Sequence, residues 1–476
     1  MKDKNKIVLV GAGINGLVMA RLLQKRGFKD IHIIEGQPEP GGLFRSCNYD
    51  VYGVYDYGIH VFQDTGVPEL EAIIRSALPE HEWDTLKGND REIAGLYFNG
   101  RLQKNTAFLD LRDTDLNGFS TKSVDFYRLL NTAPVKTNKE SHSFYEEMKS
   151  KYGSVLSEKF IFPIAESLYG KEASELHSIA STLTPFHRIV LFDEQPMLDL
   201  MKSSRIRDVF GYPEQRNLPS KYSSGLDSYY PKYFGLQKVI DSLVQQFLNE
   251  GGHLTLGARI NNLEINNGAV VGLSYDKQGT RNTITNLNHL IWTASLPALY
   301  GSVIGNKMKR LEFDPLPETC IVNISLTVPP PMSDLYFFYS YLPGGNTYRV
   351  SNPANYCSGE SRPENGLYPL CAEALFDRNL KLSDEEMLKK VLAELIEMKM
   401  VSSDSIAFSK LEKVAGGFPM PTLKNAASVL AMRNRIAELN IKNLVITGSQ
   451  STPDLFYYRD VLRYGREQVL GYLDHV

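Results

Sequence analysis

The sequence contains few cysteines, and they do not form any recognised pattern. Its four cysteines, Cys47, Cys320, Cys357 and Cys371, are scattered over 476 residues without a CxxC pair. This spacing indicates neither a zinc site nor a disulfide framework, and it is typical of a reduced intracellular protein. A chain of this length exceeds one ordinary core, so we expect two or three structural units.

Long apolar runs and an excess of positive charge are also missing. No stretch approaches the ~18 consecutive apolar residues that cross a bilayer, and the first residues lack a small-residue cleavage site. The formal net charge is −3, so the chain has no global basic field for binding nucleic-acid phosphates. We therefore expect a cytoplasmic protein with a small-molecule substrate, without a nucleic-acid partner or a transmembrane segment.

Glycines stand where a dinucleotide would bind, directly after the first apolar run. The β-branched run at 7–10 is followed by Gly11, Gly13 and Gly16 in the spacing GxGxxG, and then by a helical pattern. The first glycine allows a tight turn, the second lets a pyrophosphate approach, and the third lets helix pack on strand. Glu35 ends a second apolar run, where a carboxylate would accept hydrogen bonds from a ribose. The pattern predicts a dinucleotide site, the alternative being a glycine-rich turn that binds nothing.

A second glycine segment, Pro-Gly-Gly-Leu-Phe-Arg-Ser at 40–46, distinguishes FAD from NAD. It resembles the second glycine motif of FAD-dependent amine oxidases, protoporphyrinogen oxidases, carotenoid desaturases and UDP-galactopyranose mutases. In that superfamily the segment runs along the FAD pyrophosphate, which implies a phosphate-facing role for Arg45. The alternative for Arg45 is a solvated loop charge.

Two distant segments resemble further parts of the same FAD site. The segment at 251–260 looks like the element that returns to the adenine, and the strand and helix at 443–472 look like the closing elements beside the flavin. A helix N-terminus near the pyrimidine carbonyl would stabilise negative charge on a reduced flavin. The cofactor-binding residues implied are Gly11, Gly13, Ile14, Asn15, Gly16, Glu35, Gly41, Gly42, Leu43, Arg45, Ile260, Gly448, Asp460 and Val461.

The expected fold class is α/β, with a Rossmann-type FAD-binding domain, an inserted helical cap and an antiparallel-sheet substrate domain. The FAD-binding domain would be discontinuous and combine residues 1–65, 225–300 and 410–476. Helical periodicity predicts a mainly helical cap in 66–224, and short strand-like runs broken by turns predict an antiparallel sheet in 301–409.

Several collinear segments most resemble UDP-galactopyranose mutases. They include Tyr-Gly-Ile-His-Val-Phe at 57–62, the cap segment at 168–176, Thr-Tyr-Arg-Val at 347–350 and Phe-Tyr-Tyr-Arg-Asp-Val at 456–461. The resemblance implies an enzyme that acts on a nucleotide-activated or phosphorylated sugar in surface polysaccharide synthesis. In such mutases FAD is both nucleophile and acid/base carrier, with no net redox change.

The same resemblance implies roles for five residues near the substrate. Arg188 and Arg349 would clamp a diphosphate, because guanidinium forks bind phosphate oxygens in pairs. His60 would lie over the flavin, and Tyr457 and Tyr458 would stack on a base or bond sugar hydroxyls. The alternatives are a helix-end cap or a surface ion pair for Arg188 and structural wall positions for the tyrosines.

Departures from the mutase pattern leave a second function open. Gly448 is followed by Ser449 and Gln450 where the mutases have arginine, and Tyr169 replaces a tryptophan of the cap. The alternative is an FAD-dependent oxidoreductase of the amine oxidase and protoporphyrinogen oxidase type, which oxidises a C–N or C–C bond by hydride transfer to flavin N5. Its site would be an apolar or aromatic tunnel rather than a two-arginine clamp. His187 in place of Arg188, NAD(P)H as flavin reductant and oligomer formation stay open as well.

Overall fold

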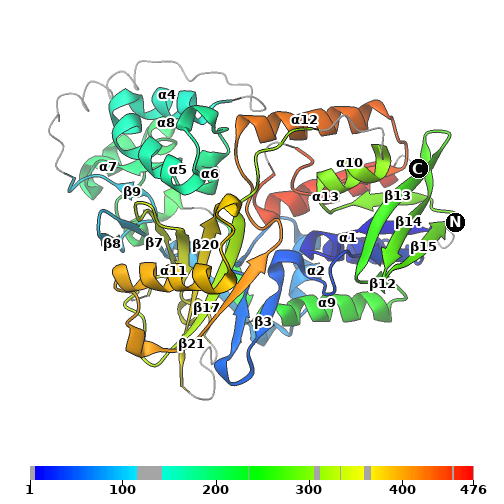
Figure 1. Cartoon of the computed structure of the whole chain (residues 1–476), viewed down its shortest axis with the longest axis horizontal. Coiled ribbons are helices and arrows are strands. Elements are labelled where there is room, and N and C mark those ends of the chain that lie inside the picture. Colours follow the sequence, from blue (N-terminus) through cyan, green and yellow to red (C-terminus); the bar gives the residue numbers. More distant parts are fainter. Residues whose placement is uncertain are drawn as a thin grey trace.

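The computed structural model describes most of the chain. The described residues are 6–114, 142–223, 225–233, 235–304, 311–332, 334–358, 366–452 and 455–474. They form a parallel sheet, a larger mixed sheet and a helical cap, arranged as three neighbouring regions (Figure 1). The expected α/β fold class is confirmed.

The first region is a parallel sheet that contains the strand before the glycine turn. Its five strands lie in the order β12 (His253–Thr255), β2 (Ile31–Ile34), β1 (Ile7–Val10), β16 (His289–Trp292) and β22 (Leu444–Ile446). Every neighbouring pair is parallel, and β1 is buried along its whole length, as expected of a strand covered on both faces. Helix α1 (Ile14–Lys25) follows β1 directly, so the predicted strand, turn and helix are confirmed.

The two faces of β1 pack in different cores because successive side chains of a strand point to opposite sides. Ile7 and Leu9 belong to the core that contains α1 and α9 (Gln237–Asn249). Val8 and Val10 belong to another core. That core also contains residues of the helices α10 (Leu296–Ile304) and α12 (Leu423–Glu438) and of the antiparallel strands β13 (Ala258–Asn266) and β14 (Ala269–Lys277). Strand β15 (Thr280–Thr285) pairs with β14 and completes this small sheet.

The second region is a seven-stranded sheet. Its order is β21 (Ile406–Val414), β17 (Glu318–Leu326), β20 (Tyr368–Phe376), β19 (Thr347–Ser351), β18 (Phe337–Ser340), β7 (Ala94–Phe98) and β8 (Arg101–Gln103). All neighbouring pairs are antiparallel except β18 and β7, which are parallel. The sheet therefore takes two strands from 94–103, far from the rest in sequence.

The third region is the cap, which sits beside one end of the seven-stranded sheet (Figure 1). Its helices are α4 (Phe144–Leu156), α5 (Phe162–Tyr169), α6 (Ala180–Leu183), α7 (Glu194–Leu200) and α8 (Ser204–Arg207). They share a core with Tyr341, Tyr348 and Phe418, and this packing fixes the cap against the end of the sheet.

Short elements connect the regions. Three strands, β5 (Phe62–Gln63), β11 (Ser228–Pro231) and β6 (Trp83–Leu86), form an antiparallel sheet next to α2 (Pro68–Arg75). The final helix, α13 (Tyr458–Leu473), packs against α1. None of the described helices combines the length and the apolar character that crossing a membrane requires.

Candidate active site

The first glycine turn depends on glycine at two positions. Gly11 adopts φ 110°, a left-handed conformation that side chains disfavour, and its N–H donates to the Ile34 carbonyl at 2.8 Å. A Cβ on Gly16 would lie 2.0 Å from the Gly11 carbonyl oxygen, whereas a Cβ on Gly13 would meet no atom within 4 Å. The backbone at Gly13 therefore remains open for a ligand at the N-terminus of α1.

The second glycine segment lies directly against the first. The Gly41 N–H donates to the Ala12 carbonyl at 2.8 Å, and both Gly41 and Gly42 have positive φ. The Arg45 guanidinium folds back, because its Nε donates to the Gly42 carbonyl at 3.0 Å and its Cζ lies 4.7 Å from the Tyr57 ring centroid. The charge of Arg45 is thus held by its own loop.

Glu35 joins the second strand to the glycine turn. One of its carboxylate oxygens accepts from the Ala12 N–H at 2.7 Å, and the other accepts from the Gln37 N–H at 2.8 Å. The Ala258 N–H donates to the Glu35 carbonyl at 2.8 Å, which brings the start of β13, and Ile260 two residues later, to the same end of the site. The carboxylate and β13 lie where a ribose and an adenine were expected.

A cavity begins at these turns and ends in an aromatic wall, and we call it the aromatic cavity. Its near end contains Gly13, Ile14, Asn15, Gly41, Gly42 and Leu43. Its aromatic wall consists of Phe44, Tyr57, His60, Tyr336, Phe337, Tyr339, Tyr348, Phe418, Phe456, Tyr457 and Tyr458. Leu43, Phe456 and Tyr457 are 38–41% exposed, and apolar surface left open in a concavity is typical of a ligand site.

The near end fits a flavin dinucleotide. The two glycine loops present backbone at a helix N-terminus, which favours phosphate, and the Asn15 Oδ1 atom is buried without a hydrogen-bond partner. The Asn15 amide donates to the Thr447 carbonyl at 2.9 Å, which places Gly448 beside the turn. A Cβ on Gly448 would lie 2.8 Å from the Ala294 carbonyl oxygen, so this position needs glycine.

His60, Tyr457 and Tyr458 meet in the aromatic cavity, as the resemblance implied. The His60 ring stacks on Phe44 with centroids 5.1 Å apart. Burial, with the charge of Arg349, lowers the pKa of His60 to about 4, so its imidazole is neutral at neutral pH. The Tyr458 hydroxyl donates to the Gln63 carbonyl at 2.5 Å, which fixes this ring as part of the wall, while Tyr457 stays exposed to the cavity.

Closing helix α13 begins beside these rings. Val461 lines the cavity, and Asp460 lies in the first turn of the helix, where its N–H donates to the Tyr457 carbonyl at 3.0 Å. The Arg459 guanidinium lies 3.7 Å from the Asp460 carboxylate. The N-terminus of α13 thus lies beside the aromatic cavity.

Arg349 lines the cavity, but one edge of its guanidinium is already bound to a carboxylate. Its Nε and Nη2 atoms donate to the two carboxylate oxygens of Glu373 at 2.6 and 2.7 Å, and the Tyr348 hydroxyl adds a bond of 2.7 Å. Burial opposes ionisation of Glu373, yet the charge and the bonds of Arg349 hold its pKa below the ordinary value. A Cβ on Gly58 would lie 2.6 Å from the Glu373 side chain. The pair is a tightly packed part of the wall.

Arg188 lies elsewhere and does not line the aromatic cavity. It precedes β10 (Ile189–Val190), with its Cζ 5.9 Å from the Phe108 ring centroid. Burial lowers the pKa of Arg188, and the nearby Asp208 opposes this shift. His187, the alternative to Arg188, contacts Phe108 edge-on with ring centroids 5.1 Å apart. The structure therefore does not bring Arg188 and Arg349 together in this cavity.

Sequence reasoning missed three charged residues that line the cavity, namely Arg91, Glu92 and Glu373. Glu373 could have been found, since it is the one charged residue in the apolar strand β20 and a buried charge needs a partner. Arg91 and Glu92 precede β7 in a polar segment that offers no such signal.

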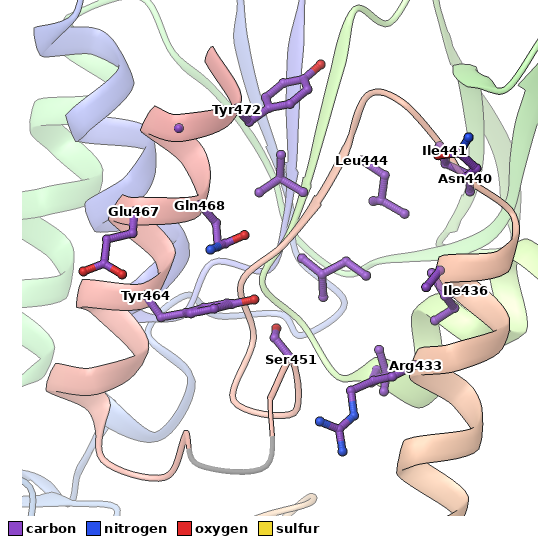
Figure 2. A pocket seen from close by; sticks show the side chains of 15 residues that line it. Arg433, Ile436, Asn440, Ile441, Leu444, Ser451, Tyr464, Glu467, Gln468 and Tyr472 are labelled. Atoms are coloured by element: carbon purple, nitrogen blue, oxygen red, sulfur yellow. The ribbon is translucent and has the colours of Figure 1, made fainter. Parts of the chain in front are cut away.

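A second hollow lies away from the glycine turns, between α12, β22 and α13 (Figure 2). Its polar lining includes Tyr464, Gln468, Ser451, Arg433, Glu467 and Asn440. Its floor is apolar, and it shares no lining residue with the aromatic cavity. The candidate chemistry therefore belongs to the aromatic cavity.

Known proteins resemble the chain in fold. Residues 9–77 match the model of the NAD(P)-binding Rossmann-like domain, and no curated protein matches the chain. Reduced UDP-galactopyranose mutase is similar with a TM-score of 0.75 at 14% identity, covering 99% of this chain and 96% of that chain. A proposed protoporphyrinogen oxidase from Exiguobacterium sp. 255-15 gives 0.67 at 15%, covering 99% of both chains. A putrescine oxidase double mutant gives 0.60 at 15%, covering 98% and 99%. Residues 9–77 thus resemble a Rossmann-like domain, within a fold that this chain shares with these proteins over nearly their whole length.

Proposed function

We propose that this chain is an FAD-dependent oxidoreductase that acts on a small, uncharged substrate in the aromatic cavity. The observation that carries this proposal is the bidentate pair of Arg349 and Glu373, which neutralises the arginine expected to hold a diphosphate. FAD, when bound, supplies the electron acceptor for the oxidation. The resemblance of the 40–46 segment to FAD-binding proteins and the two open glycine loops support this cofactor.

The charge of the cavity supports an uncharged substrate. Its charged lining consists of two cationic residues, Arg91 and Arg349, and two acidic residues, Glu92 and Glu373, so the formal charges balance. A diphosphate carries several negative charges and needs an excess of cationic donors. The aromatic wall instead offers flat apolar faces, which bind ring or chain carbons.

The residues of the chain have separable tasks in this proposal. Neutral His60 and exposed Tyr457 present polar edges to the substrate. Leu183 of α6 and Phe418 line the side of the cavity beside the cap, where they exclude water from the reacting atoms. Arg349 orients Glu373, which in turn accepts from the Tyr348 hydroxyl, and these bonds keep the wall rigid.

A mutase acting on a nucleotide-activated sugar is the second candidate. The TM-score of 0.75 with UDP-galactopyranose mutase exceeds the 0.67 and 0.60 of the two oxidases, and Arg349 lines the aromatic cavity. This candidate requires a net cationic site, so it needs groups outside the aromatic cavity to bind the phosphates.

One experiment separates the candidates. The purified protein is first analysed for bound flavin and then incubated anaerobically with UDP-galactose, with and without dithionite, and separately with a panel of primary alcohols. We expect bleaching of the flavin by a member of the panel and no isomerisation of UDP-galactose. Isomerisation that appears only after reduction contradicts the proposal and supports the mutase, whereas a protein without flavin contradicts both.

A further inference from the structure

Glu92 is a carboxylate in the aromatic cavity that the fold does not use. It lies between the short helical turn at 88–91 and β7, and its side chain is exposed to the cavity that it lines. Among the residues that the structure describes, Glu92 accepts no hydrogen bond and forms no ion pair. Partial enclosure by the cavity raises the pKa of Glu92, and the charges of Arg91, Arg349 and Arg459 oppose that rise.

Glu373, the other carboxylate of this cavity, shows the contrast. Two bonds from Arg349 and one from Tyr348 saturate it, and the Ile59 N–H lies 3.3 Å from one of its oxygens. A carboxylate can accept about four hydrogen bonds, so Glu373 has little capacity left. Glu92 is exposed, and its full capacity remains available to a ligand that enters the cavity.

The surroundings of Glu92 define the shape of such a ligand. Tyr457 and Tyr339 line the same cavity as Glu92, and the charge of Glu92 helps to raise the pKa of both hydroxyls. Neighbouring Arg91 is anchored, since its Nη1 lies 3.4 Å from the Leu226 carbonyl oxygen, and its Nε is buried without a hydrogen-bond partner. Glu92 and Arg91 are thus adjacent charged residues in a cavity whose wall is mainly aromatic.

We propose that Glu92 is a substrate-binding residue that accepts a hydrogen bond from a hydroxyl or amino group on a mainly apolar substrate. The proposal rests on the proposed function, because it takes the aromatic cavity as the substrate site. It deepens that function by naming the substrate class, a small hydrocarbon or aromatic molecule with one O–H or N–H donor. An ether or ester of the same size lacks the donor and is bound less tightly.

Calorimetric titration of the protein, purified with its flavin, tests this assignment. The probes are benzyl alcohol and benzyl methyl ether, which differ in the donor. We expect the native protein to bind the alcohol about tenfold more tightly, the ratio that one hydrogen bond to a charged group supplies. Glu92→Leu should bind both probes with equal affinity. Glu92→Gln keeps an acceptor without the charge and should retain a smaller preference.

The matched control is Glu80→Leu. Glu80 lies on the surface, where it pairs with Arg75 at 3.2 Å, and the tenfold preference should survive its loss. An unchanged preference in Glu92→Leu, or a native protein that shows no preference or binds neither probe, overturns the role of Glu92. Flavin content is measured first, because a colourless protein contradicts the proposed function, whereas a yellow protein without the preference contradicts only the assignment of Glu92.

Discussion

Glu92 and Glu373 face the same cavity, yet one belongs to the fold and the other is left to a ligand. Glu373 sits in the middle of β20, where neighbouring β19 carries Arg349 directly across the ladder. Glu92 sits before β7, where no donor of the described chain reaches it. Residue type alone therefore does not identify a binding group. A carboxylate is available to a substrate only when the protein itself does not already bond it.

The sharpest test of this comparison is the stability of two matched variants. Glu373→Leu leaves the buried Arg349 guanidinium without its partner, and we expect it to lower the free energy of unfolding by about 3–5 kcal/mol. Glu92→Leu removes a group without partners and should change this free energy by less than about 1 kcal/mol. Urea denaturation measures both values.

The double variant Arg349→Met with Glu373→Leu is the control for this pair. Replacing both charges with apolar side chains should restore most of the lost stability, since no unpaired charge remains. Equal losses in the two single variants would show that the fold depends on both carboxylates alike.

The pH dependence of stability tests whether His60 is buried in the wall of the aromatic cavity. Its folded pKa of about 4 lies below the ordinary value of 6.5, so the unfolded chain binds more protons between these values. Stability is therefore full above about pH 6.5 and falls as the pH drops toward about 4, with at most about 3 kcal/mol from this group. Thermal melts of His60→Gln should show a flatter fall, and exposed His81→Gln should not. Parallel curves for all three proteins would contradict the burial of His60.

Two glycines at the other end of the cavity allow the same comparison between a residue that the fold needs and a residue that a ligand needs. Gly16→Ala places a methyl group against the Gly11 carbonyl, and we expect a loss of about 1–3 kcal/mol in stability. Gly13→Ala meets no protein atom, so it should keep its stability but bind less flavin, because its methyl group enters the ligand space. Melting temperature and flavin content after gel filtration distinguish the two. Equal flavin content in native protein and Gly13→Ala would remove Gly13 from the proposed site.

Local pattern predicted the glycine end better than the aromatic end. Gly16 packs against the carbonyl of Gly11, five residues earlier, and Gly11 needs its own positive φ, so the spacing of this pair carries the information. The pairing of Arg349 with Glu373 depends on two strands 24 residues apart in sequence, and spacing does not encode that register. Arg45 bends back to its own loop, which only the three-dimensional path of the segment decides.

The larger sheet illustrates the same limit. The sequence at 94–103 resembles a short hairpin with a turn at Asn99 and Gly100, but it does not reveal that β7 lies beside β18. That parallel neighbour brings the segment with Arg91 and Glu92 to the cavity. The binding groups missed by sequence are therefore those that long-range pairing positions.

Among these substitutions, we expect the smallest change in ligand affinity from the replacement of Arg188. Because it lies outside the aromatic cavity, Arg188→Gln should change the calorimetric affinity for benzyl alcohol by less than about twofold. UDP is the second probe, since a diphosphate clamp formed by Arg188 and Arg349 would lose about tenfold or more in affinity when one guanidinium is removed. A large loss of UDP affinity with unchanged benzyl alcohol affinity would show that phosphates bind beside the cap. It would then favour the mutase, with the sugar in the aromatic cavity and the charge outside it.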